Sequence, residues 1–66
     1  MNILVRFVNS DDGEELGEFW LESFMPCHAY TRYRLGDKDY VPDGPERIVF
    51  EEGLVVQTIE VTEVGA

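Results

Sequence analysis

Short apolar runs separated by turn-forming residues divide this sequence into segments of strand length. Near the start of the chain, Ile3, Val5 and Phe7 occupy alternate positions, as expected for a strand with one buried face. Near the end, Ile59 and Val61 alternate with polar residues, which predicts a strand solvated on one side. Apolar runs recur about every 8–12 residues, a spacing typical of a small all-β domain.

Turn signals lie between these runs, at 10–13, 36–37, 42–45 and 52–53. Asp12-Gly13 and Glu52-Gly53 fit tight hairpins, because glycine takes up positive φ without a steric penalty. The second of them predicts a hairpin between strands at 47–51 and 54–64. At the start of its second arm, the apolar run 54–56 breaks the alternation, which indicates burial on both faces or a bulge.

The segment 14–25, EELGEFWLESFM, fits two structures. As a helix it places Leu16, Phe19, Trp20, Ser23 and Phe24 on one stripe, with Asp12 as a cap and Pro26 as a stop. As a strand, 15–23 pairs back onto 3–9 through the Asp12-Gly13 turn, with Phe19 and Leu21 facing inward and Trp20 outward. The turn chemistry favours the strand. The predicted fold is a small antiparallel β-barrel or rolled sheet of five to six short strands, SH3-like in architecture. The alternative is α+β, with one helix at 14–25 packed on a four-stranded antiparallel sheet.

The 66-residue length predicts one small domain over 1–64, with a frayed C-terminus at 65–66. A core of this size rarely supplies more than ~3–5 kcal/mol. One cysteine and one histidine provide neither an internal disulfide nor a zinc site, so we expect no metal and no cofactor. Either the core suffices alone or association supplements it.

The chain is strongly acidic, with fourteen acidic and five basic residues and a net charge of −9. This charge opposes binding to nucleic acid and to anionic membranes, and it attracts basic protein surfaces. It also fits a purely solubilising role. The sequence has no apolar run long enough to span a membrane, and the first nine residues are too short and too interrupted for a secretory signal. With a free cysteine, these features predict a cytoplasmic location.

Cations and tyrosines gather in HAYTRYRL, residues 28–35. If 28–35 is a strand, His28, Tyr30, Arg32 and Arg34 share one face. Ala29, Thr31, Tyr33 and Leu35 share the other, which we expect to be the half-buried inner face. Tyrosine and arginine are enriched at interface hot spots, so the first face is a candidate contact surface. The candidate protein-binding residues are Tyr30, Arg32, Arg34, Trp20 and Tyr40. The alternative is an ordinary strand whose arginines pair with neighbouring carboxylates.

The sequence gives little support for catalysis or for the binding of a metal ion, a phosphate group or a small molecule. Cys27 and His28 are adjacent, so on a strand their side chains point to opposite faces, and no third catalytic residue has a recognisable spacing. The acidic residues around the 12–13 turn lack the spacing of a calcium loop, and no phosphate-binding glycine loop is present. A chain this short has little room for a closed pocket of ~300 Å³ or more, so we expect no small-molecule ligand.

These observations predict a non-enzymatic acidic domain that binds another protein, with an accessory or inhibitor-like role. The partner presents a basic surface. One alternative is a structural subunit that self-associates, or docks into a larger assembly, through a strand edge. A second alternative is an acidic mimic of nucleic acid.

Overall fold

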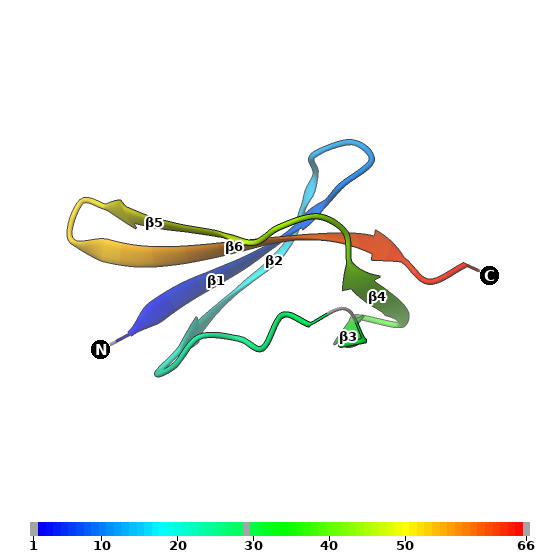
Figure 1. Ribbon diagram of the computed structural model, residues 1–66, viewed down its shortest axis with the longest axis horizontal. Helices are drawn as coiled ribbons and strands as arrows, with labels where there is room; N and C mark the ends of the chain where they lie inside the picture. Colours follow the sequence, from blue (N-terminus) through cyan, green and yellow to red (C-terminus); the bar gives the residue numbers. More distant parts are fainter. Residues whose placement is uncertain (1, 29, 66) are drawn as a thin grey trace.

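Six strands form one curled sheet in the computed structural model, which describes residues 2–28 and 30–65. The strands are β1 (Ile3–Asn9), β2 (Glu15–Leu21), β3 (Tyr33–Leu35), β4 (Lys38–Pro42), β5 (Arg47–Glu51) and β6 (Leu54–Glu63). The sheet order is β2-β1-β6-β4-β3, and β5 pairs with β6 beside this path. The sheet curls into a half-barrel (Figure 1), which confirms the rolled sheet and rejects the helix at 14–25.

Two hairpins have the predicted turns. β1 and β2 pair antiparallel from Ile3↔Leu21 onward, and Gly13 adopts a φ of 78° in the turn between them. β5 and β6 join through Glu52 and Gly53, whose φ values are 48° and 80°. Positive φ at both central residues is the signature of a type I′ turn, whose twist matches that of the flanking strands.

The sheet is mixed rather than antiparallel, which corrects the prediction. β1 lies beside β6 in parallel register, from Ile3↔Val55 to Asn9↔Val61. Everything between the first and last strands forms the crossover connection that a parallel pair requires. β6 is therefore central, with β1 along one side and first β5, then β4, along the other.

The predicted strand over 28–35 is largely wrong, because only Tyr33–Leu35 is strand. A local turn replaces its first part: the amide of Thr31 donates to the carbonyl of His28 at 3.0 Å, and the Thr31 hydroxyl accepts from the His28 amide at 3.0 Å. These bonds occupy groups that a strand would offer to a neighbour. Tyr33 still faces inward, as predicted, and Ala29 lies outside the described residues.

The core fills the inner face of the curled sheet. It comprises Ile3, Val5, Phe7, Tyr33, Tyr40, Val55, Ile59 and Val61. Val56 is also buried but lies on the outer face, so Val55 and Val56 are buried on opposite faces of the sheet, whereas Leu54, the first residue of the 54–56 run, is 40% exposed. Along the rest of β6, polar residues on the outer face alternate with the core residues, as predicted. Ala66, in the predicted frayed end, lies outside the described residues. Within the described residues, no helix is long and apolar enough to cross a membrane.

Candidate functional site: a groove between β2 and β3

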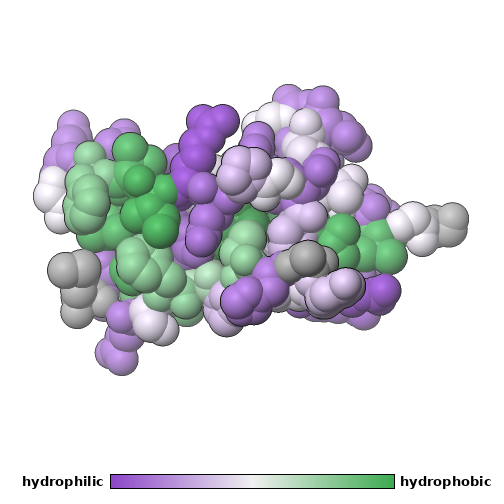
Figure 2. Space-filling view, viewed as in Figure 1, coloured by the Kyte–Doolittle hydropathy of each residue, from purple (hydrophilic) through white to green (hydrophobic). Residues whose placement is uncertain are grey.

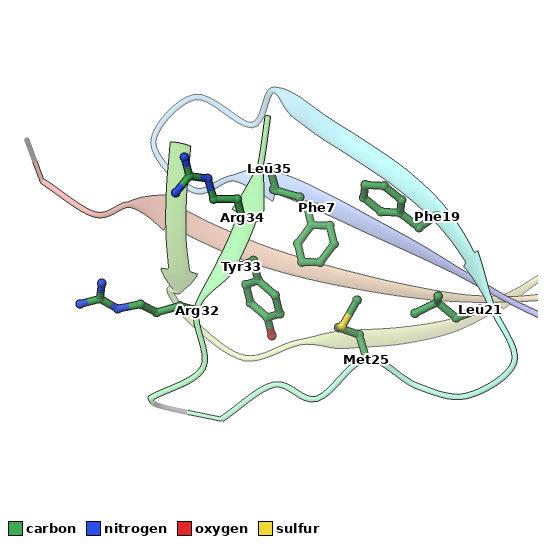
Figure 3. Close-up of a pocket in the computed structure, with 8 residues that line it drawn as sticks. All are labelled: Phe7, Phe19, Leu21, Met25, Arg32, Tyr33, Arg34 and Leu35. Carbon is green, nitrogen blue, oxygen red and sulfur yellow. The ribbon is translucent and has the colours of Figure 1, made fainter. Parts of the chain in front are cut away.

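An apolar groove opens where the half-barrel fails to close. Among the described residues, β2 and β3 end the main path of the sheet and do not pair with each other. The space between them has a volume of about 350 Å³ (Figure 3). Its lining residues are Phe7, Phe19, Leu21, Met25, Arg32, Tyr33, Arg34 and Leu35. An apolar groove flanked by two unpaired strand edges suits an extended segment of another chain.

Three aromatic rings form the centre of the groove. The Phe7 ring is buried, with its centroid 5.9 Å from that of Phe19 at an interplanar angle of 70° and 4.8 Å from that of Tyr33 at 57°. Such edge-to-face and tilted contacts are favourable for aromatic pairs. Phe19 remains 44% exposed, so one face of this cluster is open to an incoming side chain.

Gly17 explains how Phe19 reaches this position. Gly17 lies opposite Phe7 in the β1–β2 register, where any other residue would project a side chain onto the same face. The ring of Phe19 lies in that space, because a Cβ on Gly17 would be 3.2 Å from its Cε2 atom. The glycine therefore allows the Phe19 ring to lie back along β2, beside Phe7.

The segment after β2 is fastened across the groove by one buried amide. Gln57 is fully buried on the inner face of β6. Its Oε1 accepts from the Met25 amide at 2.8 Å, and its Nε2 donates to the Met25 carbonyl at 2.9 Å and to the Glu46 carboxylate. This network fixes Met25 at the groove and ties the segment before β5 to the same point.

Tyr33 adds a second attachment for this segment. Its hydroxyl donates to the Pro26 carbonyl, while its ring lines the groove. Burial away from water, together with the neighbouring Cys27 thiol, raises the pKa of Tyr33 well above its usual range. The phenol therefore stays protonated as a donor throughout the neutral range.

The predicted contact residues do not form a single surface. Arg32 and Arg34 border the groove and extend away from its apolar side chains (Figure 3). Tyr30 is 97% exposed in the turn before β3. Trp20 is exposed on the outer face of β2, which is the face opposite to the groove. Tyr40 is buried in the core, so its ring is not available as a surface anchor, and this placement corrects the prediction.

The two arginines differ in their partners. Arg34 lies 3.4 Å from the carboxylate of Asp39, in a pair exposed on both sides. Arg32 has no carboxylate within 4.0 Å in the part of the chain that the structure describes. The expectation that both arginines pair with carboxylates therefore holds for Arg34 alone.

Sequence reasoning did not identify the groove, although it placed several of its residues. Phe19, Leu21, Tyr33 and Leu35 were predicted to face inward, and all four do. The missing information was that the sheet stays open between β2 and β3. Gly17, two residues before Phe19 on the same face, was the available signal, because a glycine within a strand often marks a close approach.

Cys27 and His28 have different surroundings. Cys27 packs against the core cluster, whereas His28 is exposed. Over residues 2–28 and 30–65, no three metal-binding side chains gather closely enough to hold an ion. No family model, curated protein or solved structure matches this chain.

Proposed function

We propose that this chain is a non-enzymatic protein-binding domain whose groove takes an extended, apolar segment of a partner. The observation that carries the proposal is the groove itself, which combines exposed aromatic surface with two free strand edges. An added strand satisfies the backbone groups of an edge, and its alternate side chains point into the space between the edges. A volume of about 350 Å³ accommodates several such side chains.

The partner carries a basic surface around the segment that binds. The net charge of −9 draws basic surfaces toward the domain and accelerates their encounter with it. The groove then supplies short-range contacts, which depend little on salt. Arg32 contributes guanidinium donors for carbonyl oxygens of the bound segment, because no carboxylate of the described chain engages it.

Neighbouring residues on β2 provide a matched test of this site. Phe19 and Trp20 are 44% and 57% exposed, and they lie on opposite faces of the same strand. A phage-displayed library of random peptides is selected on the immobilised chain, and selected peptides are then measured against Phe19→Glu and Trp20→Glu. Both variants add the same charge, and circular dichroism checks that each keeps its strand content.

We expect the selected peptides to alternate apolar and polar residues. Phe19→Glu should weaken their binding at least about tenfold, or about 1.4 kcal/mol, whereas Trp20→Glu should leave it within about twofold. A library that yields no binding peptide contradicts the proposal. If Trp20→Glu is the damaging change, the outer face is the site. If only salt abolishes binding, the acidic surface is the site, as in a nucleic-acid mimic.

A further inference from the structure

The β5–β6 hairpin leaves apolar side chains exposed at one end of the molecule. Every residue of β5 is exposed, and Phe50 reaches 79%. Ile48, Val49 and Leu54 are each at least 40% exposed on the same hairpin. Figure 2 shows apolar surface gathered at this end, over the position of the hairpin in Figure 1. Exposed apolar surface of this kind marks a contact site more often than a solvated one.

β5 is also an unprotected sheet edge. Among the described residues it pairs with β6 alone, so its other side is free. Proteins usually protect such edges with charges, prolines or bulges. The three central residues of β5 are instead Ile48, Val49 and Phe50. By contrast, the free edge of β2 includes two glutamates and a glycine, and its pairing with β1 contains an irregularity.

The hairpin register determines which backbone groups this edge offers. A two-residue turn brings Glu51 and Leu54 into a hydrogen-bonded pair. Because such pairs alternate along an antiparallel ladder, Val49 and Arg47 also direct their amides and carbonyls toward β6. The amides and carbonyls of Ile48 and Phe50 therefore point outward, toward the free edge.

The sequence of β5, RIVFE, is complementary to itself in antiparallel orientation. Pairing two copies about Val49 places Ile48 opposite Phe50 of the second copy, so the outward backbone groups meet in two hydrogen-bonded pairs. The same register places Arg47 opposite Glu51 of the second copy, twice by symmetry. Shifting the register by one residue on each strand also brings outward backbone groups opposite each other. It places charged residues opposite apolar ones or glycine, however, and both ion pairs are lost.

The two charged side chains needed for this pairing form no direct ion pair within the part of the monomer that the structure describes. Within the described residues, neither Arg47 nor Glu51 has an oppositely charged group within 4.0 Å. Arg6, which shares the outer face with both, is held instead by Glu15 at 3.0 Å and by Glu18 at 2.8 Å. The hydrogen bond that Arg6 donates to Glu18 raises the pKa of Arg6, and the charges of Glu18, Glu15 and, without direct contact, Glu51 act in the same direction.

An apolar row on the outer face of the sheet also ends at Val49, the centre of this pairing, and continues into the second copy. Trp20 lies beside Leu4, Leu4 beside Val56, and Val56 beside Val49, in successive strands. Registered neighbours in a sheet point to the same face. Pairing about Val49 joins this row to that of the second copy, and the two together form one stripe across eight strands.

We propose that two copies of this chain associate through their β5 edges, in antiparallel register centred on Val49, to form a two-fold symmetric dimer with one continuous sheet. The contact is isologous, so it closes on itself and leaves no further β5 edge for growth. Since one short edge buries less than a standard interface, we expect a dissociation constant of about 10–100 µM. This dimer does not depend on the groove, which lies at other strand edges.

Charge reversal tests the dimer and its register together. Arg47→Glu places a glutamate opposite Glu51 at both symmetric positions, and Glu51→Arg places an arginine opposite Arg47. Combining the two changes restores opposite charges in the same register. Lys38→Glu, at the exposed first residue of β4, is the matched control for the Arg47→Glu change in net charge.

Sedimentation equilibrium from ~10 to ~500 µM, at ~150 mM salt, measures the association constant of each form. We expect each single reversal to weaken dimerisation at least about tenfold, the double variant to return to within about threefold of the parent, and Lys38→Glu to change it less than about threefold. Amide hydrogen exchange of Ile48 and Phe50 should slow with increasing concentration, because their N–H groups are free in the monomer and bonded in the dimer.

A parent chain that stays monomeric at ~500 µM overturns the proposal. A dimer whose double variant is no stronger than the single variants overturns the register. Association that leaves the Ile48 and Phe50 amides unprotected places the contact on another surface, and it also contradicts the proposal.

Discussion

Gln57 offers the sharpest test of how this small domain holds its groove. Its side chain is fully buried, yet it makes hydrogen bonds to Met25 and Glu46, which belong to two different segments. Gln57→Glu keeps the shape of the side chain but replaces an amide that donates two bonds by a carboxylate that donates none at neutral pH. The new carboxylate also faces the carboxylate of Glu46.

The magnitude follows from the bonds that are lost. Two donated bonds contribute about 1 kcal/mol each, and the buried carboxylate, which keeps the Met25 amide as a donor to one oxygen only, costs about 1–3 kcal/mol more. The expected loss is about 3–5 kcal/mol, comparable to the whole stability that a core of this size supplies. Burial and the Glu46 carboxylate raise the pKa of the introduced acid in the folded state. The introduced acid is therefore neutral in the folded variant below about pH 4, where it destabilises the fold least. The variant loses stability relative to the parent as the pH rises through the pKa of this acid in the folded state.

Urea unfolding at several pH values measures both effects. At neutral pH the variant should unfold at a urea concentration about 3 M below that of the parent, or be unfolded outright, given a slope of about 1 kcal/mol per molar. The difference should shrink toward pH 4. Thr58→Glu is the matched control, because Thr58 lies on the outer face between Arg6 and Arg47. A Gln57→Glu variant as stable as this control, or one that gains on the parent as the pH rises, refutes the reasoning.

Four other changes have defined outcomes. Glu52→Asn should raise the melting temperature by about 3 °C, because asparagine tolerates the positive φ of 48° at this position better than glutamate, and an unchanged value contradicts this. Since burial raises the pKa of Tyr33, the protonated phenol stabilises the fold fully below about pH 10, and this stabilisation is lost as the pH rises through the pKa of the folded state. Urea midpoints should therefore fall more steeply above pH 10 in the parent than in Tyr33→Phe, and parallel curves would exclude this role. Replacing both Arg32 and Arg34 by alanine should raise the dissociation rate of a groove-binding peptide about tenfold. Raising the salt concentration from about 50 to 500 mM should instead lower mainly the association rate. Stopped-flow kinetics measures both rates, and an unchanged dissociation rate in the double variant counts against the arginines. Cys27→Ser should leave peptide binding within about threefold by calorimetry while reducing thermal stability, and complete loss of binding with the fold intact would reopen a role for the thiol.

Local signals in the sequence predicted the hairpins correctly. Asp12-Gly13 and Glu52-Gly53 specify their turns through the φ values that glycine allows, and those turns set the register of the flanking strands. The same chemistry distinguished strand from helix at 14–25, where the apolar pattern alone was ambiguous.

Longer-range features had no comparable signal. The parallel pairing of β1 with β6 joins residues about fifty positions apart, and no adjacent residues encode it. At 28–35 the alternation suggested a full strand, but Thr31 supplied a local hydrogen-bond partner for His28 that ended it. The groove depends on both features. β3 begins only at Tyr33 and β1 pairs with β6, so β2 has no partner strand on its free side among the described residues.

A nuclear magnetic resonance titration tests the groove most directly. The ¹⁵N-labelled chain is titrated with a library-selected peptide, and the backbone shift changes are mapped onto the sheet. We predict that the largest changes lie at Phe19, Tyr33 and Leu35, on the two edges that border the groove, and that Phe19→Glu abolishes them. Changes centred on Trp20 and Val49 on the outer face, with Phe19 unaffected, would contradict the account.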